Sequence, residues 1–407
     1  MIADFEHRGE FRDQVESLLD FGRAAQVPGG FAWLDEQGRP TPGQPLRLYV
    51  AARMTHVYSL AALLGHPGAS ALAAHGLHSL ETTFADGVHG GWYASVPGPE
   101  GGAGETTKAG YPHAFVMLAA SSAATAGLPG AIELLARAEG LYLDRFWDEA
   151  QAMPVEDWDR TFTHCSTYRG ANSSMHAVEA MVAVTEATGD PAWLDRAEAI
   201  AGRLMAVARR HDWRLPEHYD EHWKPDLTVG QDTPEDPVRP YGSTPGHGLE
   251  WARLLVQLQV ADERAGRTPA EDWTAVAVAL AERAVADGWA ADGTDGFVYT
   301  VDFKGAPVVR ARMHWVLCEA LGTATVLGQR TGDAQYAHWF RQWWQFAQAH
   351  QIDTRRGSWH HELGPDLQPS ARIRPGKADL YHAVQACLLP SLPLSGTLAS
   401  AVRASQG

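Results

Sequence analysis

The sequence predicts an all-helical protein, an (α/α)6 barrel of about twelve helices with short β-hairpins at one end, as one domain over residues 1–407. Apolar residues recur at three- and four-residue spacing along the whole chain. Glycine-led aromatic segments separate pairs of such stretches. The unit of two helices and one hairpin recurs about every sixty residues, as in repeat architectures, so about six units would use up the chain.

Alanine-rich amphipathic stretches define the helices. Gly189-Asp190-Pro191 and Gly332-Asp333 combine a helix-ending glycine with an N-cap carboxylate, so each marks a boundary between two helices. We expect helices over residues 5–24, 47–64, 68–83, 111–126, 130–146, 172–187, 192–210, 246–264, 270–287, 311–331, 333–350 and 378–389.

Glycine-led aromatic segments lie between the helix pairs and predict hairpins, because turn residues surround a short run suited to a strand. These segments are Gly30-Phe31-Ala32-Trp33, Gly90-Gly91-Trp92-Tyr93, Gly296-Phe297-Val298-Tyr299 and Gly357-Ser358-Trp359-His360. An open solenoid of the same units is the alternative. We favour a closed barrel, because no repeat has the polar face of a terminal capping repeat.

Composition narrows the partners. The formal net charge of −16 disfavours nucleic acid and anionic membranes, and no apolar run is long enough to span a bilayer. The first residues contain acids and no apolar core of a leader peptide, so we expect no secretory signal. The 3 cysteines lie far apart and do not resemble a disulfide framework, which favours the cytoplasm. The state of assembly, monomer or homodimer, stays open.

Polar residues gather on alternate predicted helices, which would be the inner helices of a barrel. Several are spaced three or four apart and therefore share one helix face. They are Arg53 and His56; Tyr111 and His113; Asn172, His176 and Glu179; His247, Glu250 and Trp251; Trp315 and Glu319; and Asp379 and His382.

Histidine suits reversible proton transfer, because its unperturbed pKa of about 6.5 allows it to take and return a proton near neutrality. Three converging histidines therefore favour proton transfer next to a carbonyl carbon without a cofactor. A metal site is disfavoured, since no compact ligand spacing occurs. A glycoside hydrolase would need two acids, and Glu250 with Glu319 is the candidate pair.

Four segments carry a family resemblance: AARMTHVYSLA (51–61), RGANSSMHAVEAM (169–181), PGHGLEWARLL (245–255) and KADLYHAVQA (377–386). They resemble the N-acylglucosamine 2-epimerase superfamily, in particular its mannose isomerase and sulfoquinovose isomerase branch. The resemblance covers nearly the whole chain. It implies an (α/α)6 barrel that interconverts free sugars and needs no obligatory cofactor.

By motif, the resemblance implies that His247 and His382 transfer protons, that His176 is a third active-site histidine and that Arg53 binds substrate. We expect a cis-enediol route in which Arg53 steadies the developing oxyanion and Glu250 orients His247. Further substrate-binding candidates are Asn172, Glu250, Tyr111, Trp315, Glu319, Trp251, Trp359 and Asp379. The tryptophans and Tyr111 are candidate walls for the apolar face of a pyranose ring.

The expected reaction is D-mannose to D-fructose, with D-lyxose to D-xylulose as a side activity. The acidic chain and Glu362, in the last predicted hairpin, disfavour an anionic sugar such as sulfoquinovose. A sugar 2-epimerase on the same scaffold is the main alternative. A glycoside hydrolase and a non-catalytic sugar-binding barrel are the alternatives from other classes.

Overall fold

The computed structural model describes residues 5–406, and the chain forms two compact units. Unit 1 is Met1–Leu18, Ala201–Lys377 and His382–Leu394, and unit 2 is Leu19–Ile200, Ala378–Tyr381 and Ser395–Gly407. Three helices cross from one unit to the other: α1 (Phe5–Gly22), α7 (Ala192–Arg210) and α12 (Tyr381–Leu388). The single catalytic domain over 1–407 stays a prediction. Residues 1–4, part of the segment expected to carry no leader, lie outside the described range.

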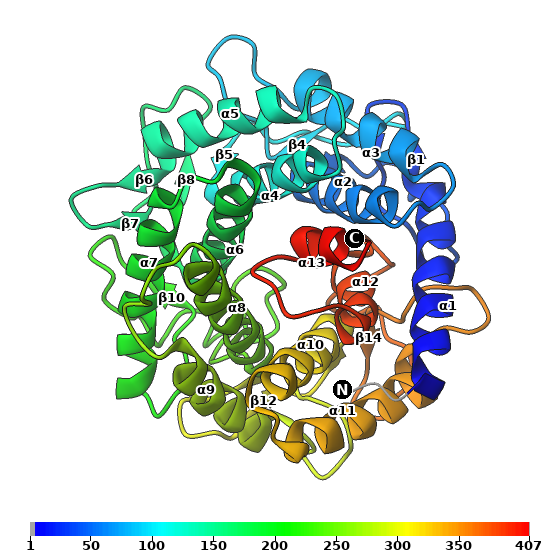
Figure 1. Ribbon diagram of the computed structural model, residues 1–407, viewed down its shortest axis with the longest axis vertical. Helices are drawn as coiled ribbons and strands as arrows, with labels where there is room; N and C mark the ends of the chain where they lie inside the picture. Colours follow the sequence, from blue (N-terminus) through cyan, green and yellow to red (C-terminus); the bar gives the residue numbers. More distant parts are fainter. Residues whose placement is uncertain (1–4, 407) are drawn as a thin grey trace. The chain divides into compact units, whose positions relative to one another are not determined.

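Unit 2 contains a layer of three adjacent helices (Figure 1). Helix α4 (Gly110–Thr125) packs between α2 (Leu48–Leu63) and α6 (Ala171–Thr188). Almost every residue of these helices is buried, as expected for helices covered by other helices on all sides.

A second layer of unit 2 covers the first. Helix α3 (Ala69–His78) packs on α2, and α5 (Ala131–Leu141) packs on α4. The short α13 (Leu398–Ser405) contacts both α2 and α4. The periodicity did not predict α13, because its two turns are too short to show a repeating pattern.

Unit 1 has the same two-layer construction (Figure 1). The nearly fully buried helices α8 (Pro245–Arg264) and α10 (His314–Thr331) pack against each other. Helix α9 (Trp273–Gly288) covers α8, and α11 (Ala334–Phe346) covers α10. The alternation of buried and covering helices predicted from sequence is therefore present within each unit.

The covering helices α3, α5 and α11 each continue into a π-helical turn, and these turns span Ser79–Thr83, Tyr142–Phe146 and Ala347–Gln351. The predicted segments 68–83, 130–146 and 333–350 correspond to helix plus π turn, so their ends are confirmed within a few residues. Two short 3-10 segments, Arg23–Ala25 and Leu389–Ser391, complete the helical part of the described chain.

All paired strands described here are short and antiparallel. In unit 2, β1 (Gln26–Val27) pairs with β2 (Gly30–Phe31), β3 (Leu46–Arg47) with β4 (Ser95–Val96), β5 (Lys108–Ala109) with β8 (Asp157–Trp158), and β6 (Trp147–Asp148) with β7 (Met153–Pro154). In unit 1, β11 (Thr300–Val301) pairs with β12 (Pro307–Val309), and β13 (Arg312–Met313) with β14 (Glu362–Leu363). The two remaining strands are β9 (Arg169–Gly170) and β10 (His218–Tyr219).

The aromatic residue of each predicted hairpin pairs with the chain that leaves the preceding helix, 3-10 segment or π turn. Phe31 pairs with Gln26, and single bridges join Trp92 to Ala85, Phe297 to Trp289 and Trp359 to Ile352. The four predicted hairpins are therefore confirmed.

Buried ion pairs tie the start of several buried helices to the preceding hairpin. Lys108 Nζ lies 3.1 Å from Asp86 before α4, and Arg312 lies 2.6 Å from Asp292 before α10. Lys377 Nζ lies 2.8 Å from Asp353 before α12 and also donates to the Gly357 carbonyl. Because both partners are buried, each pair fixes the direction in which the next helix begins.

Membrane insertion has no candidate segment between residues 5 and 406, since no helix there is both long and apolar enough to span a bilayer.

Candidate active site

The buried helices open to solvent at one equivalent position near their N-terminal ends. The second residue of α2, α4, α6 and α10 and the third of α8 are partly exposed, while the other residues of their first two turns are buried. These residues are Tyr49, Tyr111, Asn172, Trp315 and His247. Four of the five were predicted site residues. Tyr49 was missed, although its register at the start of α2 could have revealed it.

Unit 1 brings two of the predicted histidines to one indole. The ring centroid of Trp315 lies 5.0 Å from that of His247 and 5.9 Å from that of His382. Trp315 lies three residues after Arg312. The buried Arg312–Asp292 pair therefore fixes the start of α10 and with it the position of the Trp315 side chain. Two imidazoles beside one indole form a site suited to moving protons on a substrate that has an apolar face.

His382 is held by a buried carboxylate. Its Nδ1 lies 2.8 Å from Glu319 Oε1, and Nε of Arg253 donates to Glu319 Oε2 at 2.8 Å. Burial alone would raise the pKa of Glu319, but the charge of Arg253 and the contacts with Arg253 and His382 outweigh burial and lower the pKa to about 2. Glu319 is therefore an anion at neutral pH and accepts the Nδ1 proton of His382, so the unprotonated ring nitrogen is Nε2.

His247 has its own carboxylate partner, Glu217. Nδ1 of His247 lies 2.8 Å from Glu217 Oε2, and the backbone N–H of Thr244 donates to the other oxygen at 3.2 Å. Burial would raise the pKa of Glu217, yet the charge and hydrogen bond of His247 hold it below its ordinary value. Glu217 therefore orients the imidazole and also fixes the residue that precedes α8.

The expected role of Glu250 as the partner of His247 is wrong. Glu217 takes the Nδ1 position, and Glu250 lies on the side of Arg253, whose Nη2 is 3.4 Å away. One helical turn between Glu250 and His247 put them on one face, but Glu217 reaches the ring from the loop before α8. Sequence spacing gave no signal for Glu217, because it lies 30 residues upstream of His247.

Unit 2 holds the predicted arginine among aromatic rings. Nη1 of Arg53 donates to Asp379 at 3.2 Å and Nη2 donates to Tyr111 Oη at 2.8 Å. Its guanidinium lies 4.5 Å from the ring centroid of Phe115 and 4.7 Å from that of Tyr381. Burial would lower the pKa of Arg53, but Tyr111 and Asp379 raise it above its ordinary value, so the side chain stays cationic.

His176, also in unit 2, has a carboxylate partner on its own helix. Its Nδ1 lies 3.1 Å from Glu179 Oε2, and its ring packs against Phe115 and Tyr111 with centroids 4.5 and 5.3 Å away. The three predicted histidines therefore share one arrangement: Nδ1 of each faces a glutamate carboxylate, and these carboxylates fix the tautomer.

Two other histidines of the predicted polar clusters have structural roles. Nδ1 of His56 bonds Ser122 Oγ at 2.7 Å in the core. Nδ1 of His113 donates to the Ala109 carbonyl and its Nε2 accepts from the backbone N–H of Trp92. Burial lowers the pKa of His113 to about 3, so its ring is neutral and serves the hairpin.

Trp251 and Trp359 are wrong as sugar walls. Both side chains are 0% exposed, so neither indole offers a face to a ligand. They fill the core of unit 1 instead. The sequence could not separate them from Trp315, because a tryptophan on an apolar helix or hairpin has the same local pattern whether it faces the core or solvent.

Glu250, Glu319 and His382 are a group that could hold a metal ion, since one ligand atom from each lies within 4.8 Å of the others. Arg253, however, already bonds Glu319 and faces Glu250, so a cation occupies the position between the carboxylates. The residues fit a metal poorly. The expected absence of a metal and of a cofactor stays a prediction.

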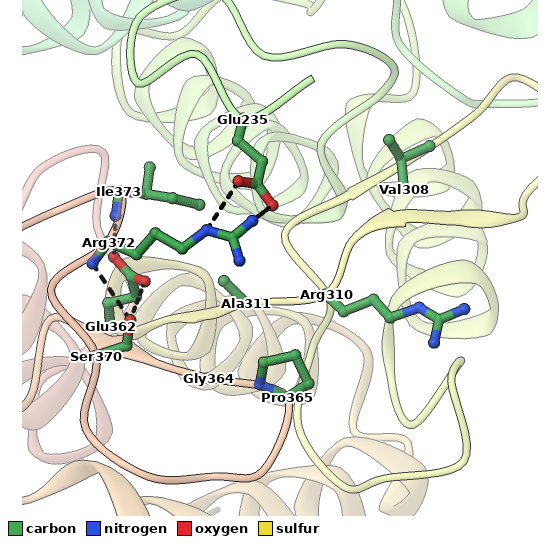
Figure 2. Close-up of a pocket in the computed structure, with 10 residues that line it drawn as sticks. All are labelled: Glu235, Val308, Arg310, Ala311, Glu362, Gly364, Pro365, Ser370, Arg372 and Ile373. Atoms are coloured by element: carbon green, nitrogen blue, oxygen red, sulfur yellow. Dashed lines mark hydrogen bonds and ion pairs between the residues drawn. The ribbon is translucent and has the colours of Figure 1, made fainter. Parts of the chain in front are cut away.

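A pocket of about 240 Å³ lies elsewhere in unit 1 and contains none of the predicted site residues. Figure 2 shows Arg372 reaching across it to Glu235, where Nε donates at 2.9 Å. Glu362 has its carboxylate occupied by Ser370 Oγ at 2.5 Å and by the backbone N–H of Ile373 at 2.7 Å. Glu362 therefore stabilises this loop. Its charge does not disfavour an anionic sugar, in contrast to the expectation from sequence.

Comparison with known proteins identifies the family. The family model described as N-acylglucosamine 2-epimerase (GlcNAc 2-epimerase) matches residues 29–386. The chain belongs to the N-acylglucosamine 2-epimerase family. This membership confirms the resemblance carried by the four sequence motifs.

Relatives in this family cover almost the whole chain. A D-mannose isomerase of Thermobifida fusca is 48% identical over 97% of this chain and 97% of its own length. A D-mannose isomerase of Pseudomonas cannabina pv. alisalensis is 43% identical over 95% of this chain and 92% of its own.

Solved structures confirm the fold class. A crystal structure of a D-mannose isomerase matches with a TM-score of 0.87 and 26% identity, covering 96% of this chain and 99% of that one. A cellobiose 2-epimerase from Bacillus thermoamylovorans B4167 matches with a TM-score of 0.81 and 18% identity, covering 94% and 98%. The all-helical (α/α)6-barrel class predicted from sequence is therefore that of this family member.

Proposed function

We propose that this family member is an aldose–ketose isomerase that interconverts D-mannose and D-fructose. The observation that carries the proposal is that His247 and His382 both contact one partly exposed indole, that of Trp315. Each of these histidines is held by a carboxylate. Relatives named D-mannose isomerase at 48% and 43% identity support the same substrate.

The proposed chemistry is a proton transfer from C2 to C1 of the open-chain aldose. One imidazole removes the C2 proton while the carbonyl oxygen at C1 gains a proton, which gives a cis-enediol. The enediol then loses the O2 proton as C1 gains one, which leaves a ketone at C2. Because Glu217 and Glu319 hold Nδ1 of His247 and His382, each ring would use Nε2 for these transfers.

Arg53 and His176 are proposed to act on the oxygens. A cation that stays charged stabilises the developing enediolate, and the contacts of Arg53 with Asp379 and Tyr111 orient its guanidinium before the reaction. His176, held by Glu179, is proposed to assist ring opening. Asn172 and Tyr111, which are partly exposed, are proposed to bind hydroxyls.

The hydrolase alternative is weakened by the acids themselves. A glycoside hydrolase needs one carboxyl group whose pKa is raised so that it can act as an acid. In Glu319, burial raises the pKa, but the opposite effect of Arg253 and His382 is larger and lowers the pKa to about 2. The 2-epimerase alternative keeps the same residues and differs in returning the proton to C2 on the other face.

One assay separates these functions. The purified protein, treated with a chelator, is incubated with D-mannose in heavy water and the products are analysed by NMR. Fructose is the expected product, with deuterium at C1 where the base exchanges its proton with solvent. Glucose without fructose would instead establish an epimerase, and no turnover of any free aldose would leave a binding protein or hydrolase. D-Lyxose is proposed as a second substrate and is tested in the same way.

The proposed setting is the cytoplasm, with a neutral monosaccharide as the small-molecule partner. Cys165, Cys318 and Cys387 are free thiols in the described chain, which fits a reducing compartment. Chromatography with light scattering decides between monomer and homodimer.

A further inference from the structure

We propose that Tyr381 is a positioning residue that couples Arg53 to His176 through Glu179. The inference rests on the proposed function, because it assigns both side chains to one reaction. All residues involved belong to unit 2.

Glu179 is shared by two donors. Its carboxylate accepts the Tyr381 hydroxyl at 2.6 Å and faces Nδ1 of His176 at 3.1 Å. The three side chains come from α6 and from the start of α12, which lie 202 residues apart at Glu179 and Tyr381. Because Glu179 and Tyr381 are buried, the hydroxyl takes the place of water as a hydrogen-bond donor to the carboxylate.

Tyr381 is also fixed relative to Arg53. The Arg53 guanidinium lies 4.7 Å from the Tyr381 ring centroid, within the range of a cation–π contact. The backbone N–H of Tyr381 donates to Asp379 Oδ1 at 3.0 Å, and the other oxygen of Asp379 accepts from Arg53 at 3.2 Å. The ring of Tyr381 thus contacts Arg53 directly, and its backbone holds the Asp379 carboxylate that binds the same arginine.

Tyr111 provides a second link between Arg53 and His176. Its hydroxyl accepts from Arg53 Nη2 at 2.8 Å, and its ring meets the His176 ring edge-on at 5.3 Å. Arg53 and His176 are therefore linked both through Tyr111 and through Tyr381 with Glu179. A displacement of Arg53 would therefore disturb the contacts of His176, and the reverse also holds. The shared contacts hold both side chains in place before substrate binds.

A purely structural tyrosine would stabilise the fold and nothing more. Coupling predicts an additional effect, because loss of the hydroxyl leaves Glu179 buried with one donor fewer. A buried carboxylate with fewer donors takes up a proton at higher pH. His176 would then be held by a carboxylate that has lost one of its two hydrogen-bond donors, so kcat as well as stability should fall.

The test is Tyr381→Phe, which keeps the ring beneath Arg53 and removes only the hydroxyl. We expect kcat to fall about tenfold with KM changed less than about twofold, as for loss of one hydrogen bond to a charged group. The acid limb of the pH profile of kcat/KM should move to higher pH, because a buried carboxylate that has lost a donor is protonated more readily. Tyr58→Phe is the matched control: its buried hydroxyl donates to the Leu19 carbonyl at 3.0 Å and should leave kcat and the pH profile unchanged.

A double-mutant cycle gives the second arm. If Tyr381 acts through His176, Tyr381→Phe has no further effect on kcat in a His176→Asn background. Additive losses, or a pH profile identical to that of the wild type, would overturn the inference. Should Tyr381→Phe fail to fold, Glu179→Gln serves instead, since it keeps the size of the side chain and removes its charge. The coupling then requires a lower kcat than that of the wild type and no further loss when His176→Asn is added. An inactive wild type would contradict the proposed function, whereas an active wild type with an unaffected Tyr381→Phe would contradict only the coupling.

Discussion

The carboxylate of Glu217 lies 2.8 Å from Nδ1 of His247 and also accepts the backbone N–H of Thr244, the residue before α8. One side chain thus fixes both the start of a helix and the orientation of the imidazole on its first turn. Because Glu217 is buried, this contact is shielded from bulk solvent.

Glu217→Gln should therefore lower kcat about 10- to 100-fold with little change in KM, because the anionic acceptor of His247 Nδ1 becomes a neutral amide while the substrate contacts remain. Steady-state kinetics with D-mannose check this. Glu221→Gln, an exposed glutamate on the same loop, is the control. Equal kinetics for the two variants would show that Glu217 does not support His247.

His247→Asn and His382→Asn should each lower kcat by about 10²–10⁴-fold, the range for removal of a general acid or base. The exposed His78 of α3, changed to Asn, should leave the rate unaltered. A loss below tenfold for either site variant would remove that histidine from the mechanism.

The tryptophans should divide into two groups. Trp315→Phe, at the partly exposed indole, should change KM and kcat, whereas Trp251→Phe should lower the free energy of unfolding by about 1–3 kcal/mol and leave KM unchanged. Urea unfolding and kinetics on both variants check the division. A raised KM for Trp251→Phe would return Trp251 to the sugar-binding site.

Glu156 should make stability depend on pH. Burial, followed by the charge of Asp157, raises the pKa of Glu156 from 4.5 to about 7, so the folded state binds its proton more tightly than the unfolded chain. This contribution to stability is complete below pH 4.5 and is lost as pH rises through about 7. Glu156→Gln, whose amide oxygen can still accept from Ser173 and Gly170, should raise Tm relative to the wild type at pH 8 and not at pH 4.5. The exposed Glu149→Gln should show no such pH-dependent gain.

Lys377→Met should destabilise the protein by about 3–5 kcal/mol, since it leaves Asp353 buried without its ammonium partner. Denaturant unfolding measures the loss, and Lys304→Met on an exposed turn is the control. Because Lys377 precedes α12, the variant should also lose activity at temperatures where it is still folded. Full activity with full stability would mean that the pair does not fix α12.

The helices were predictable because their apolar spacing is local, and α2, α4, α6, α8 and α10 begin within three residues of the expected positions. His176, His247, His382, Arg53 and Trp315 were predictable because register and motif both identify them. Glu217 was not, since a loop residue acquires its partner only through tertiary structure. The π turns after α3, α5 and α11 were equally hidden, because a π turn and an α-helix share the same apolar residues.

The equivalent position at the start of each buried helix has a consequence for how such enzymes diversify. Tyr49, Tyr111, Asn172, Trp315 and His247 occupy nearly the same register in successive repeats, while the residues behind them are packed. Tyr111 holds Arg53 and His247 is assigned to the chemistry, but substitution at Tyr49, Asn172 or Trp315 would exchange an accessible group and leave the packed residues behind it in place. Family members can therefore differ in the group that one repeat presents to a sugar, with little effect on folding.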